Sequence, residues 1–289
     1  MFYEGRVYRP PSEARSLIIQ ATVGCSHNGC TFCSMYKGEP FKIKPYNRIM
    51  EDMQTARELY THVEKMFLAD GDCMMMPAED LKKILDLAKI VFPELKQIST
   101  YGTTKSILKK SKEELLMLKE HGLDMIYLGV ESGSAKVLEH VKKGVTPDEI
   151  IKSGRMVREA GIKLSVTFIS GLGSDILSHE HAVESARVIN DMQPDYIGLL
   201  TLLLEPHAPL YKEVQDGSFH YLEPHEVLLE TKTMVENIDV PHGVFRSNHA
   251  SNYVPLRGTF PDDKERILRD IEKGLSIDDA TFKNKYRAL

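Results

Sequence analysis

The sequence lacks any uninterrupted apolar run of about 20 residues, the length that a helix needs to span a bilayer. It also lacks a secretory signal pattern, because Glu4, Arg6 and Arg9 lie near the start with no apolar segment behind them. We therefore expect a cytoplasmic protein that does not enter a membrane. Cysteine is scarce, with four in 289 residues, yet three of the four lie within nine residues. In a reducing compartment such clustering favours metal ligands or catalytic thiols over disulfides.

An excess of positive charge is also missing. The chain has 37 Lys and Arg against 42 Asp and Glu, a formal charge of −5. This balance argues against a general nucleic-acid binder, which needs basic surface to displace counterions. The composition is otherwise globular, with 42% apolar and 27% charged residues. The length suits one barrel-sized domain or two smaller ones, and we find no repeat and no linker long enough to separate domains.

Short apolar runs alternate with segments of helical period along most of the chain. This alternation predicts right-handed parallel βα units, in an open sheet or in a whole or partial barrel. The predicted strands are 17–23, 63–68, 97–101, 125–130, 164–169 and 196–204. The predicted helices between them include 78–91, 112–121, 146–160 and 180–192. After about residue 222 the rhythm fades into a helix at 224–236, an irregular or strand-like segment at 244–254 and a helix at 262–274.

Local signals support these boundaries. Ser111 precedes Glu114 by three residues and Thr146 precedes Glu149 by three, which predicts a capping box at each helix start. Gly122 and the glycine at 161 stand where helices should end. Polar or glycine-rich residues follow most of the predicted strands, so the functional site is expected at the carboxyl ends of the strands. These segments are Gly24-Cys25, Asp70-Gly71-Asp72, Glu131-Ser132, Gly171-Leu172-Gly173 and Glu205-Pro206-His207.

The cysteine cluster follows the first predicted strand as a C-x4-C-x2-C loop formed by Cys25, Cys30 and Cys33. Three thiolates are too few for a closed tetrahedral zinc site. On a four-iron cubane they would leave one iron with an open position. Three alternatives stay open at this point. They are a structural zinc site with His27 or Cys73 as fourth ligand, a redox-active thiol, and unrelated buried thiols.

These features together resemble the radical S-adenosylmethionine (SAM) enzymes. Phe32 occupies the aromatic place before the last cysteine of the loop, although the first gap is one residue longer than the usual three. The stretch Tyr127-Leu128-Gly129-Val130-Glu131-Ser132-Gly133-Ser134, with the later Lys142-Lys143-Gly144, is similar to the subgroup of anaerobic coproporphyrinogen oxidases and elongator-type radical domains. The resemblance covers about residues 15–205.

The resemblance implies an α/β fold, a partial (β/α)6 TIM-like barrel with a short C-terminal extension. We expect the core barrel over residues 1–222 and the extension over 223–289, packed on the barrel as part of the same structural unit. It also implies an oxygen-sensitive [4Fe–4S] cluster held by Cys25, Cys30 and Cys33. The fourth iron of this cluster would chelate SAM, and reductive cleavage of SAM would give a 5′-deoxyadenosyl radical that abstracts hydrogen from a substrate.

The resemblance places the methionine ammonium of SAM at Asp70, Gly71 and Asp72, where the family carries a Gly-Gly-Glu-like motif. Gly71 would permit close backbone approach and carboxylates suit an ammonium. Glu131 matches a polar residue that binds the ribose hydroxyls. An ordinary polar turn at Asp70 to Asp72, and an N-cap at Glu131, are the structural alternatives.

The remaining cofactor contacts implied by the resemblance come later in the chain. Ile169, Gly171 and Leu172 match the adenine contact, with a tight βα turn as the alternative. Arg155 or Arg158 could reach the methionine carboxylate, although a solvated surface arginine is the simpler interpretation of either.

Three residues are candidates for a catalytic role: Cys73, His207 and His249. Cys73 could face the radical site as a thiol, or pack as a small residue beside Met74-Met75-Met76. A lone histidine is more often structural than catalytic. The polar run 246–253 could line a substrate pocket, with a solvated loop or a capping network as the alternative.

The expected substrate is a small molecule or a peptide, since no further cysteine cluster and no basic appended domain are found. The expected partner is a reductase such as flavodoxin or ferredoxin, which the resemblance implies as electron donor. Nucleic acid is not expected. The competing hypotheses are a non-catalytic iron–sulfur or zinc-binding protein, including an electron-transfer protein, and a barrel enzyme with mononuclear zinc.

Overall fold

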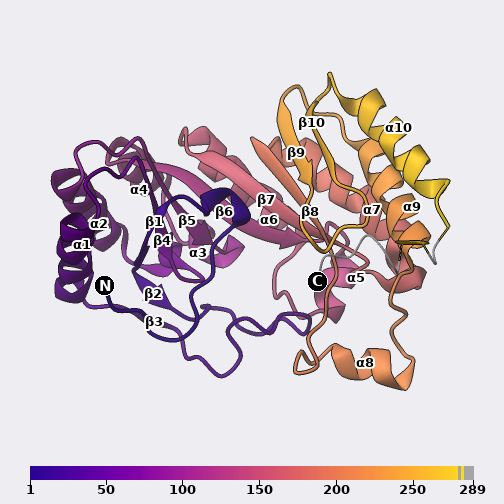
Figure 1. Cartoon of the computed structure of the whole chain (residues 1–289), viewed down its shortest axis with the longest axis horizontal. Coiled ribbons are helices and arrows are strands. Elements are labelled where there is room, and N and C mark those ends of the chain that lie inside the picture. Colours follow the sequence, from indigo (N-terminus) through magenta and orange to yellow (C-terminus); the bar gives the residue numbers. More distant parts are fainter. Residues whose placement is uncertain (279–280, 283–289) are drawn as a thin grey trace. The chain divides into compact units, whose positions relative to one another are not determined.

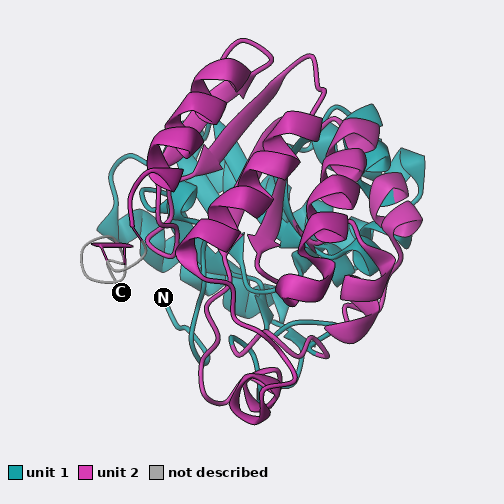
Figure 2. Ribbon diagram, turned by 90° about the vertical axis from the view of Figure 1, so that its right-hand side faces the viewer, with its two compact units in different colours: residues 1–28, 35–128, 153–164 teal, residues 29–34, 129–152, 165–289 magenta. Residues whose placement is uncertain are grey.

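The computed structural model describes residues 1–278 and 281–282. Its larger sheet has eight strands in the order β1-β4-β5-β6-β7-β8-β9-β10, and a smaller sheet pairs β2 with β3 (Figure 1). The chain divides into two compact units (Figure 2). Unit 1 comprises residues 1–28, 35–128 and 153–164, and unit 2 comprises residues 29–34, 129–152 and 165–289.

Unit 1 carries the first strands of the large sheet, all paired in parallel. They are β1 (Leu17–Gln20), β4 (Lys65–Ala69), β5 (Gln97–Gly102) and β6 (Leu123–Glu131), the last belonging to this unit as far as Leu128. Its helices are α1 (Tyr46–Leu59), α2 (Ala78–Val91), α3 (Thr104–Leu108) and α4 (Lys112–Glu120), with short 3-10 turns η1 (Pro11–Glu13) and η2 (Cys73–Met75). The last four residues of β4 are buried, as expected for a strand covered on both faces.

The first predicted strand is two strands with different partners. β1 pairs with β4, whereas β2 (Thr22–Val23) pairs antiparallel with β3 (Lys42–Ile43). The change of partner falls at Ala21, whose amide donates to Ala69 and whose carbonyl accepts from the Lys44 amide at 2.9 Å. The residues between β2 and β3, which include the three clustered cysteines, are therefore closed off as a loop by a short ladder.

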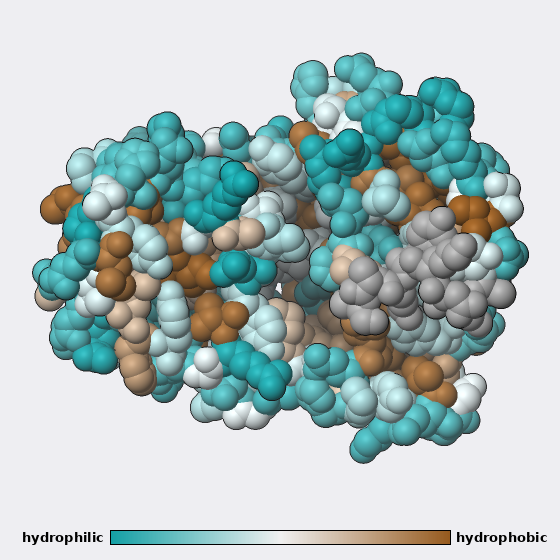
Figure 3. Space-filling view, viewed as in Figure 1, coloured by the Kyte–Doolittle hydropathy of each residue, from teal (hydrophilic) through white to brown (hydrophobic). Residues whose placement is uncertain are grey.

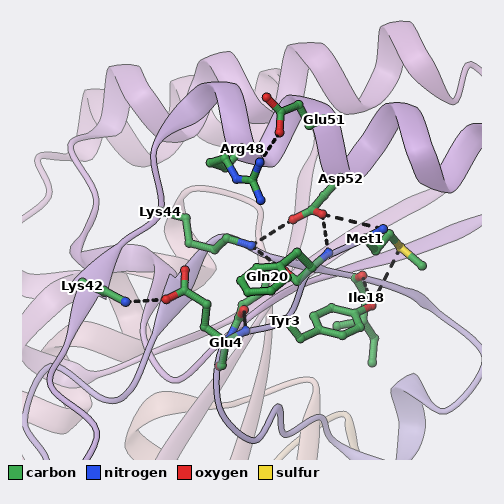
Figure 4. A network of polar contacts seen from close by, with 11 residues as sticks. Met1, Tyr3, Glu4, Ile18, Gln20, Lys42, Lys44, Arg48, Glu51 and Asp52 are labelled. Carbon is green, nitrogen blue, oxygen red and sulfur yellow. Dashed lines mark hydrogen bonds and ion pairs between the residues drawn. The ribbon is translucent and has the colours of Figure 1, made fainter.

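The first residues of the chain cover the outer edge of β1 (Figure 4). The Gln20 side chain accepts from the Glu4 amide at 2.8 Å and donates to the Glu4 carbonyl at 2.9 Å, as a neighbouring strand would. A buried ion pair between Lys44 and Asp52, 2.9 Å apart, anchors the same segment, because Asp52 also accepts from the Phe2 amide at 2.6 Å. The Tyr3 hydroxyl also donates to the Ile18 carbonyl of β1 at 2.9 Å, so this segment partly covers an edge strand that would otherwise expose unpaired backbone groups.

The strands of unit 2 are β7 (Lys163–Ser170, in this unit from Ser165), β8 (Tyr196–Thr201) and β9 (Gly243–Ser247), which pair in parallel, and β10 (Leu256–Phe260), which runs antiparallel to β9. Its helices are α5 (Ala135–His140), α6 (Pro147–Glu159, in this unit as far as Lys152), α7 (Ser174–Met192), α8 (Tyr211–Asp216), α9 (Pro224–Asn237) and α10 (Lys264–Leu275).

The predicted helix boundaries are largely confirmed. Both capping boxes form, with the Glu114 amide 3.1 Å from the Ser111 hydroxyl and the Glu149 amide 3.3 Å from the Thr146 hydroxyl. The glycines at 122 and 161 adopt φ of +104° and +74°, the left-handed conformation that ends a helix. One boundary was wrong, because α7 begins at Ser174 and not at residue 180.

The fold class is confirmed as α/β with a partial barrel. The six predicted βα strands correspond to β1, β4, β5, β6, β7 and β8, and two further strands, β9 and β10, come from residues after 222. Within the described residues no pairing joins β1 to β10, so the sheet is open. The face shown in Figure 3 mixes hydrophilic residues with smaller hydrophobic groups, which is ordinary for a globular surface. No described helix has both the length and the apolarity required to cross a bilayer.

Candidate functional site

The loop that carries the cysteines starts with a tight turn in unit 1. Gly24 has φ of +70°, and a Cβ on it would lie 2.9 Å from the Glu39 carbonyl oxygen, so only glycine fits there without strain. Cys25 follows directly and is half-buried. The Asn28 side chain donates to the Tyr36 carbonyl at 2.7 Å, which ties the loop to the segment that returns to β3. The position of Cys25 is thus fixed by backbone geometry on both sides.

The second half of the loop belongs to unit 2 and is anchored there. The Thr31 amide donates to the Val141 carbonyl at 2.9 Å, and the Thr31 carbonyl accepts from the Leu210 amide at 2.9 Å. Phe32 packs against the apolar cluster that includes Val141 and Leu210. Cys30 and Cys33, on either side of this anchor, are both half-buried. The aromatic residue of the motif therefore serves as the anchor of the two cysteines that flank it.

The chemistry of this loop fits an iron–sulfur cluster. Within the described residues, which contain all four cysteines, no disulfide forms. In the same part of the chain, no three His, Cys, Asp or Glu side chains already stand together as a metal-ion site. Cys25 belongs to unit 1, and Cys30 and Cys33 belong to unit 2. The assignment of the three as ligands therefore depends on their thiolate chemistry and their spacing on one loop.

The acid turn after β4 (Asp70-Gly71-Asp72) contains two carboxylates with different surroundings. Asp72 is fully buried and accepts hydrogen bonds from Ser26, from Ser106 at 2.6 Å and from the Thr103 hydroxyl at 2.9 Å. Burial still outweighs these donors and raises the pKa of Asp72. Because both of its oxygens are engaged, Asp72 connects the cysteine loop, through Ser26, to the start of α3.

Asp70 is the carboxylate of the acid turn that keeps a buried oxygen available. Its Oδ1 accepts from the Tyr36 hydroxyl, whereas Oδ2 is buried and has no hydrogen-bond partner among the described residues. Burial raises the pKa of Asp70 from 3.8 to about 6, although the Tyr36 hydroxyl and, more weakly, the Tyr8 backbone and the Gln20 side chain favour the charged form. An unpartnered buried carboxylate oxygen is costly, and a bound cation would remove that cost.

Gly71 brings the acid turn into direct contact with the start of the cysteine loop. A Cβ on Gly71 would lie 2.8 Å from the Gly24 carbonyl oxygen and 2.9 Å from the Tyr36 ring. We expect Gly71→Ala to lower the free energy of unfolding by about 2 kcal/mol, because backbone and a buried ring must both shift. Urea unfolding of the cluster-free protein measures this loss.

Gly198→Ala is the matched control, since its nearest contact would be an ordinary 3.4 Å from the Val166 carbonyl oxygen. A Gly71→Ala protein as stable as the Gly198→Ala protein would show that the acid turn and the loop are not tightly packed.

Cys73 lies just after the acid turn, in the core of unit 1. It is fully buried, its thiol donates to the Leu68 carbonyl at 3.4 Å, and its sulfur lies 3.7 Å from the Thr22 hydroxyl. Burial raises the pKa of Cys73 to about 12, so the group is a neutral thiol at physiological pH. These surroundings are those of a packed small residue.

Glu131 is the last residue of β6 and lies in unit 2. It has φ of +70°, a left-handed conformation that is uncommon for a residue with a side chain and that is often found at functional sites. Lys143 lies 2.9 Å from its Oε1, and both side chains are largely buried. The N-cap of α5 is Ser134, whose hydroxyl accepts from the Val137 amide, so capping does not account for Glu131.

The turn between β7 and α7 contains the residues expected at the adenine. Gly171 has φ of +84° and its amide donates to Glu230 of α9 at 2.7 Å. Leu172 is fully buried in an apolar cluster of unit 2, and Ile169 packs against that cluster while keeping part of its surface exposed. Of these three residues, Ile169 keeps part of its surface exposed, whereas Gly171 and Leu172 are buried.

Arg155 and Arg158 are exposed on α6 in unit 1. His207 is exposed in unit 2 and lies 3.0 Å from Glu205, a contact between neighbouring surface groups. His249 is also exposed, with Nδ1 2.9 Å from the Ser251 hydroxyl. None of these four has the buried surroundings of the acid turn.

The polar run 246–253 forms a network at the carboxyl end of β8. Asn252 accepts from the Thr201 amide at 2.8 Å and donates to the Leu199 carbonyl at 2.8 Å. It also donates to the Ser247 hydroxyl at 2.6 Å. The buried residues of this run therefore form a capping network, the alternative to a substrate pocket. This network fixes the β9–β10 connection at the carboxyl end of the sheet, where βα folds carry their sites.

Comparison with known proteins identifies the family. The Radical SAM superfamily profile matches residues 19–186, more than half of the chain, and the chain belongs to this superfamily. The heme chaperone HemW of Bacillus subtilis is 25% identical over 184 residues, which cover 63% of this chain and 48% of HemW. The chain thus spans about half the length of that curated relative.

Solved structures show the same fold. Methylornithine synthase (PylB) has a TM-score of 0.56 at 15% identity and covers 89% of this chain and 68% of its own. Coproporphyrinogen III oxidase (HemN) from Escherichia coli has a TM-score of 0.56 at 16% identity and covers 76% of this chain and 52% of its own. The members of this superfamily are enzymes that use a [4Fe–4S] cluster and SAM.

Proposed function

We propose that Cys25, Cys30 and Cys33 hold a [4Fe–4S] cluster with one iron left for SAM, and that the enzyme acts on a small-molecule or peptide substrate. When bound, the cluster and SAM supply a 5′-deoxyadenosyl radical that abstracts hydrogen from the substrate. The observation that carries the proposal is the acid turn, where a buried Asp70 oxygen lacks a partner and Gly71 packs against Gly24, directly before Cys25.

The acid turn of unit 1 is proposed to bind the methionine ammonium. A cation beside Oδ2 of Asp70 would satisfy an oxygen that otherwise has no partner, and would hold the carboxylate charged although burial favours its neutral form. Tyr36 holds the other oxygen and so fixes the direction in which the carboxylate points. Asp72 supports the turn from within, and Arg155 or Arg158 remains a proposed contact of the methionine carboxylate.

Unit 2 is proposed to bind the nucleoside half of SAM. Glu131 can accept hydrogen bonds from both ribose hydroxyls, and the strained backbone at this residue is held in place by its ion pair with Lys143. The adenine contact would come from Ile169 and the Gly171 backbone, with Leu172 supporting the turn from the core.

The substrate end is proposed to include the β9–β10 connection, which Asn252 fixes at the carboxyl end of β8. His249 on this connection and His207 are the candidate substrate contacts, whereas the buried thiol of Cys73 is proposed to pack in the core of unit 1. We propose residues 1–222 as the catalytic core and residues 223–289 as an extension of it, of which residues 279–280 and 283–289 lie outside the part of the chain that the structure describes. Superfamily members require an electron donor, and a reductase such as flavodoxin or ferredoxin is proposed here.

The decisive experiment is anaerobic. Protein reconstituted with iron and sulfide is reduced with dithionite and given SAM, and 5′-deoxyadenosine is quantified by chromatography. We expect cleavage in proportion to cluster content. A cluster that binds without producing 5′-deoxyadenosine would favour a non-catalytic iron–sulfur protein. About one zinc per chain with no acid-labile sulfide would favour the zinc alternative.

A further inference from the structure

A buried polar cluster in unit 2 has no role in the function proposed above. We name it the backing cluster, and it consists of Ser132, Ser178, His181 and Glu230. Ser132 and His181 are fully buried, and Glu230 is 3% exposed. A carboxylate is costly to bury and is kept in a core only where its hydrogen bonds compensate.

The hydrogen bonds of Glu230 are directed at the turn between β7 and α7. Its Oε1 accepts from the Gly171 amide at 2.7 Å, and its Oε2 accepts from the Ser178 hydroxyl in the first turns of α7 at 2.6 Å. Glu230 comes from α9, 59 residues further along the chain than Gly171. One side chain of the C-terminal region thus holds both the turn and the helix that follows it.

The other end of the backing cluster lies behind Glu131. The hydroxyl of Ser132, the next residue, is 2.7 Å from Nδ1 of His181. Nε2 of His181 has no hydrogen-bond partner among the described residues and lies 3.8 Å from Oε1 of Glu230. Burial lowers the pKa of His181, so the imidazole is neutral near pH 7 and Glu230 depends on its N–H and O–H donors.

We propose, on the basis of the function proposed above, that Glu230 is a positioning residue for SAM. It fixes the Gly171 amide and so sets the shape of the turn that receives adenine. His181 and Ser132 support the backbone next to Glu131, the carboxylate that is proposed to bind the ribose hydroxyls. Gly171 has φ of +84°, a conformation that glycine leaves readily when nothing holds it. The C-terminal region therefore shapes the cofactor site as well as any substrate site.

The first test needs no cofactor. Hydrogen–deuterium exchange is followed on the cluster-free protein in the peptide that spans residues 168–174, for Glu230→Ala and Glu230→Gln. We expect the alanine variant to exchange about tenfold faster in this peptide, because the Gly171 amide loses its acceptor. The glutamine variant keeps a carbonyl oxygen in place and should retain the wild-type rate.

Met234→Ala is the matched control, because Met234 lies on the same helix, is fully buried and makes no part of the backing cluster. It should destabilise α9 without selective loss of protection at residues 168–174. Equal exchange in the Glu230→Ala and Met234→Ala proteins would overturn the inference.

The second test separates binding from catalysis on the reconstituted enzyme. Glu230→Ala should raise KM for SAM about tenfold with little change in kcat or cluster content, and Glu230→Gln should restore KM. Ser132→Ala, a milder change at the other end of the backing cluster, is the variant to use if Glu230→Ala fails to fold. It should raise KM for SAM about threefold. An unchanged KM in the folded variants would overturn the inference. Absence of cleavage by the wild type would instead overturn the proposed function, and the exchange experiment would still decide the role of Glu230 in the turn.

Discussion

Replacing Cys30 with alanine is expected to abolish SAM cleavage, to below about a thousandth of the wild-type rate. Two thiolates cannot hold a cubane that needs three protein ligands to leave one iron open. The same loss is expected for Cys25 and Cys33. Iron and acid-labile sulfide per chain, the broad visible absorption of the reconstituted protein and the yield of 5′-deoxyadenosine measure the effect.

Cys73→Ala is the matched control, because it removes a thiol from the same unit as Cys25 without touching the loop. Its thiol is fully buried and neutral, so we expect a normal cluster and at most a small loss of stability from the lost packing. A cluster that survives Cys30→Ala but disappears with Cys73→Ala would show that the ligands are assigned wrongly.

The parallel core could be predicted from sequence because its signals are local. Helix α2 has the predicted bounds, since its apolar residues recur at helical spacing on a face that is buried. The capping boxes at Ser111 and Thr146 need only residues three apart. The fold class followed from the alternation of such elements.

The misses have physical causes. Helix α1 was not predicted, because its sequence is rich in polar residues and its buried face includes Asp52, an acid that pattern reading treats as solvent-exposed. The break at Ala21 was missed because a change of strand partner leaves the apolar pattern intact. Strand β9 falls largely in the segment 244–254, which was predicted only as irregular or strand-like, and β10 was not predicted. Both strands depend on pairing with β8 or with each other, contacts that a local pattern does not encode.

In the candidate site, too, features that are local in the sequence could be predicted and features that depend on distant contacts could not. The cysteine loop and the acid turn are contiguous motifs, so they could be proposed as candidate site segments from the sequence. The supports of these motifs come from distant segments, with Tyr36 holding Asp70 and Ser106 holding Asp72. A single tyrosine or serine carries no signal of such a role. Glu230 is a similar case, because an acid in an amphipathic helix is expected on the solvated face and this one is buried.

The sequence gives no reason to distinguish the two aspartates of the acid turn, but in the structure their carboxylates differ in hydrogen bonding. Asp72 is engaged by three side chains, whereas Asp70 has one engaged and one unpartnered oxygen. This difference arises from which residues surround each carboxylate in the fold, and it makes Asp70 the more informative target for mutation.

Asp70→Asn is expected to weaken SAM binding about 100-fold, because the buried side chain that faces the methionine ammonium loses its negative charge. The same substitution is expected to raise the free energy of unfolding above pH 7. The folded pKa of Asp70, about 6, lies above the ordinary 3.8. The folded state therefore binds more protons between these values, and stability falls as pH rises from about 4 to about 6. The gap corresponds to about 3 kcal/mol. Urea unfolding of cluster-free wild type and variant from pH 4 to pH 8 measures it.

Above pH 7 the asparagine variant escapes this penalty, whereas near pH 4 the wild-type carboxyl is itself neutral and the advantage should vanish. Tyr36→Phe supplies the opposite change, because it removes the hydroxyl that favours the charged carboxylate. It should therefore lower stability more at pH 8 than at pH 4. An Asp70→Asn protein that binds SAM normally, or whose stability follows pH as the wild type does, would show that Asp70 is an ordinary turn residue. A protein that gains stability while losing SAM binding would show that its buried charge is maintained for the ligand.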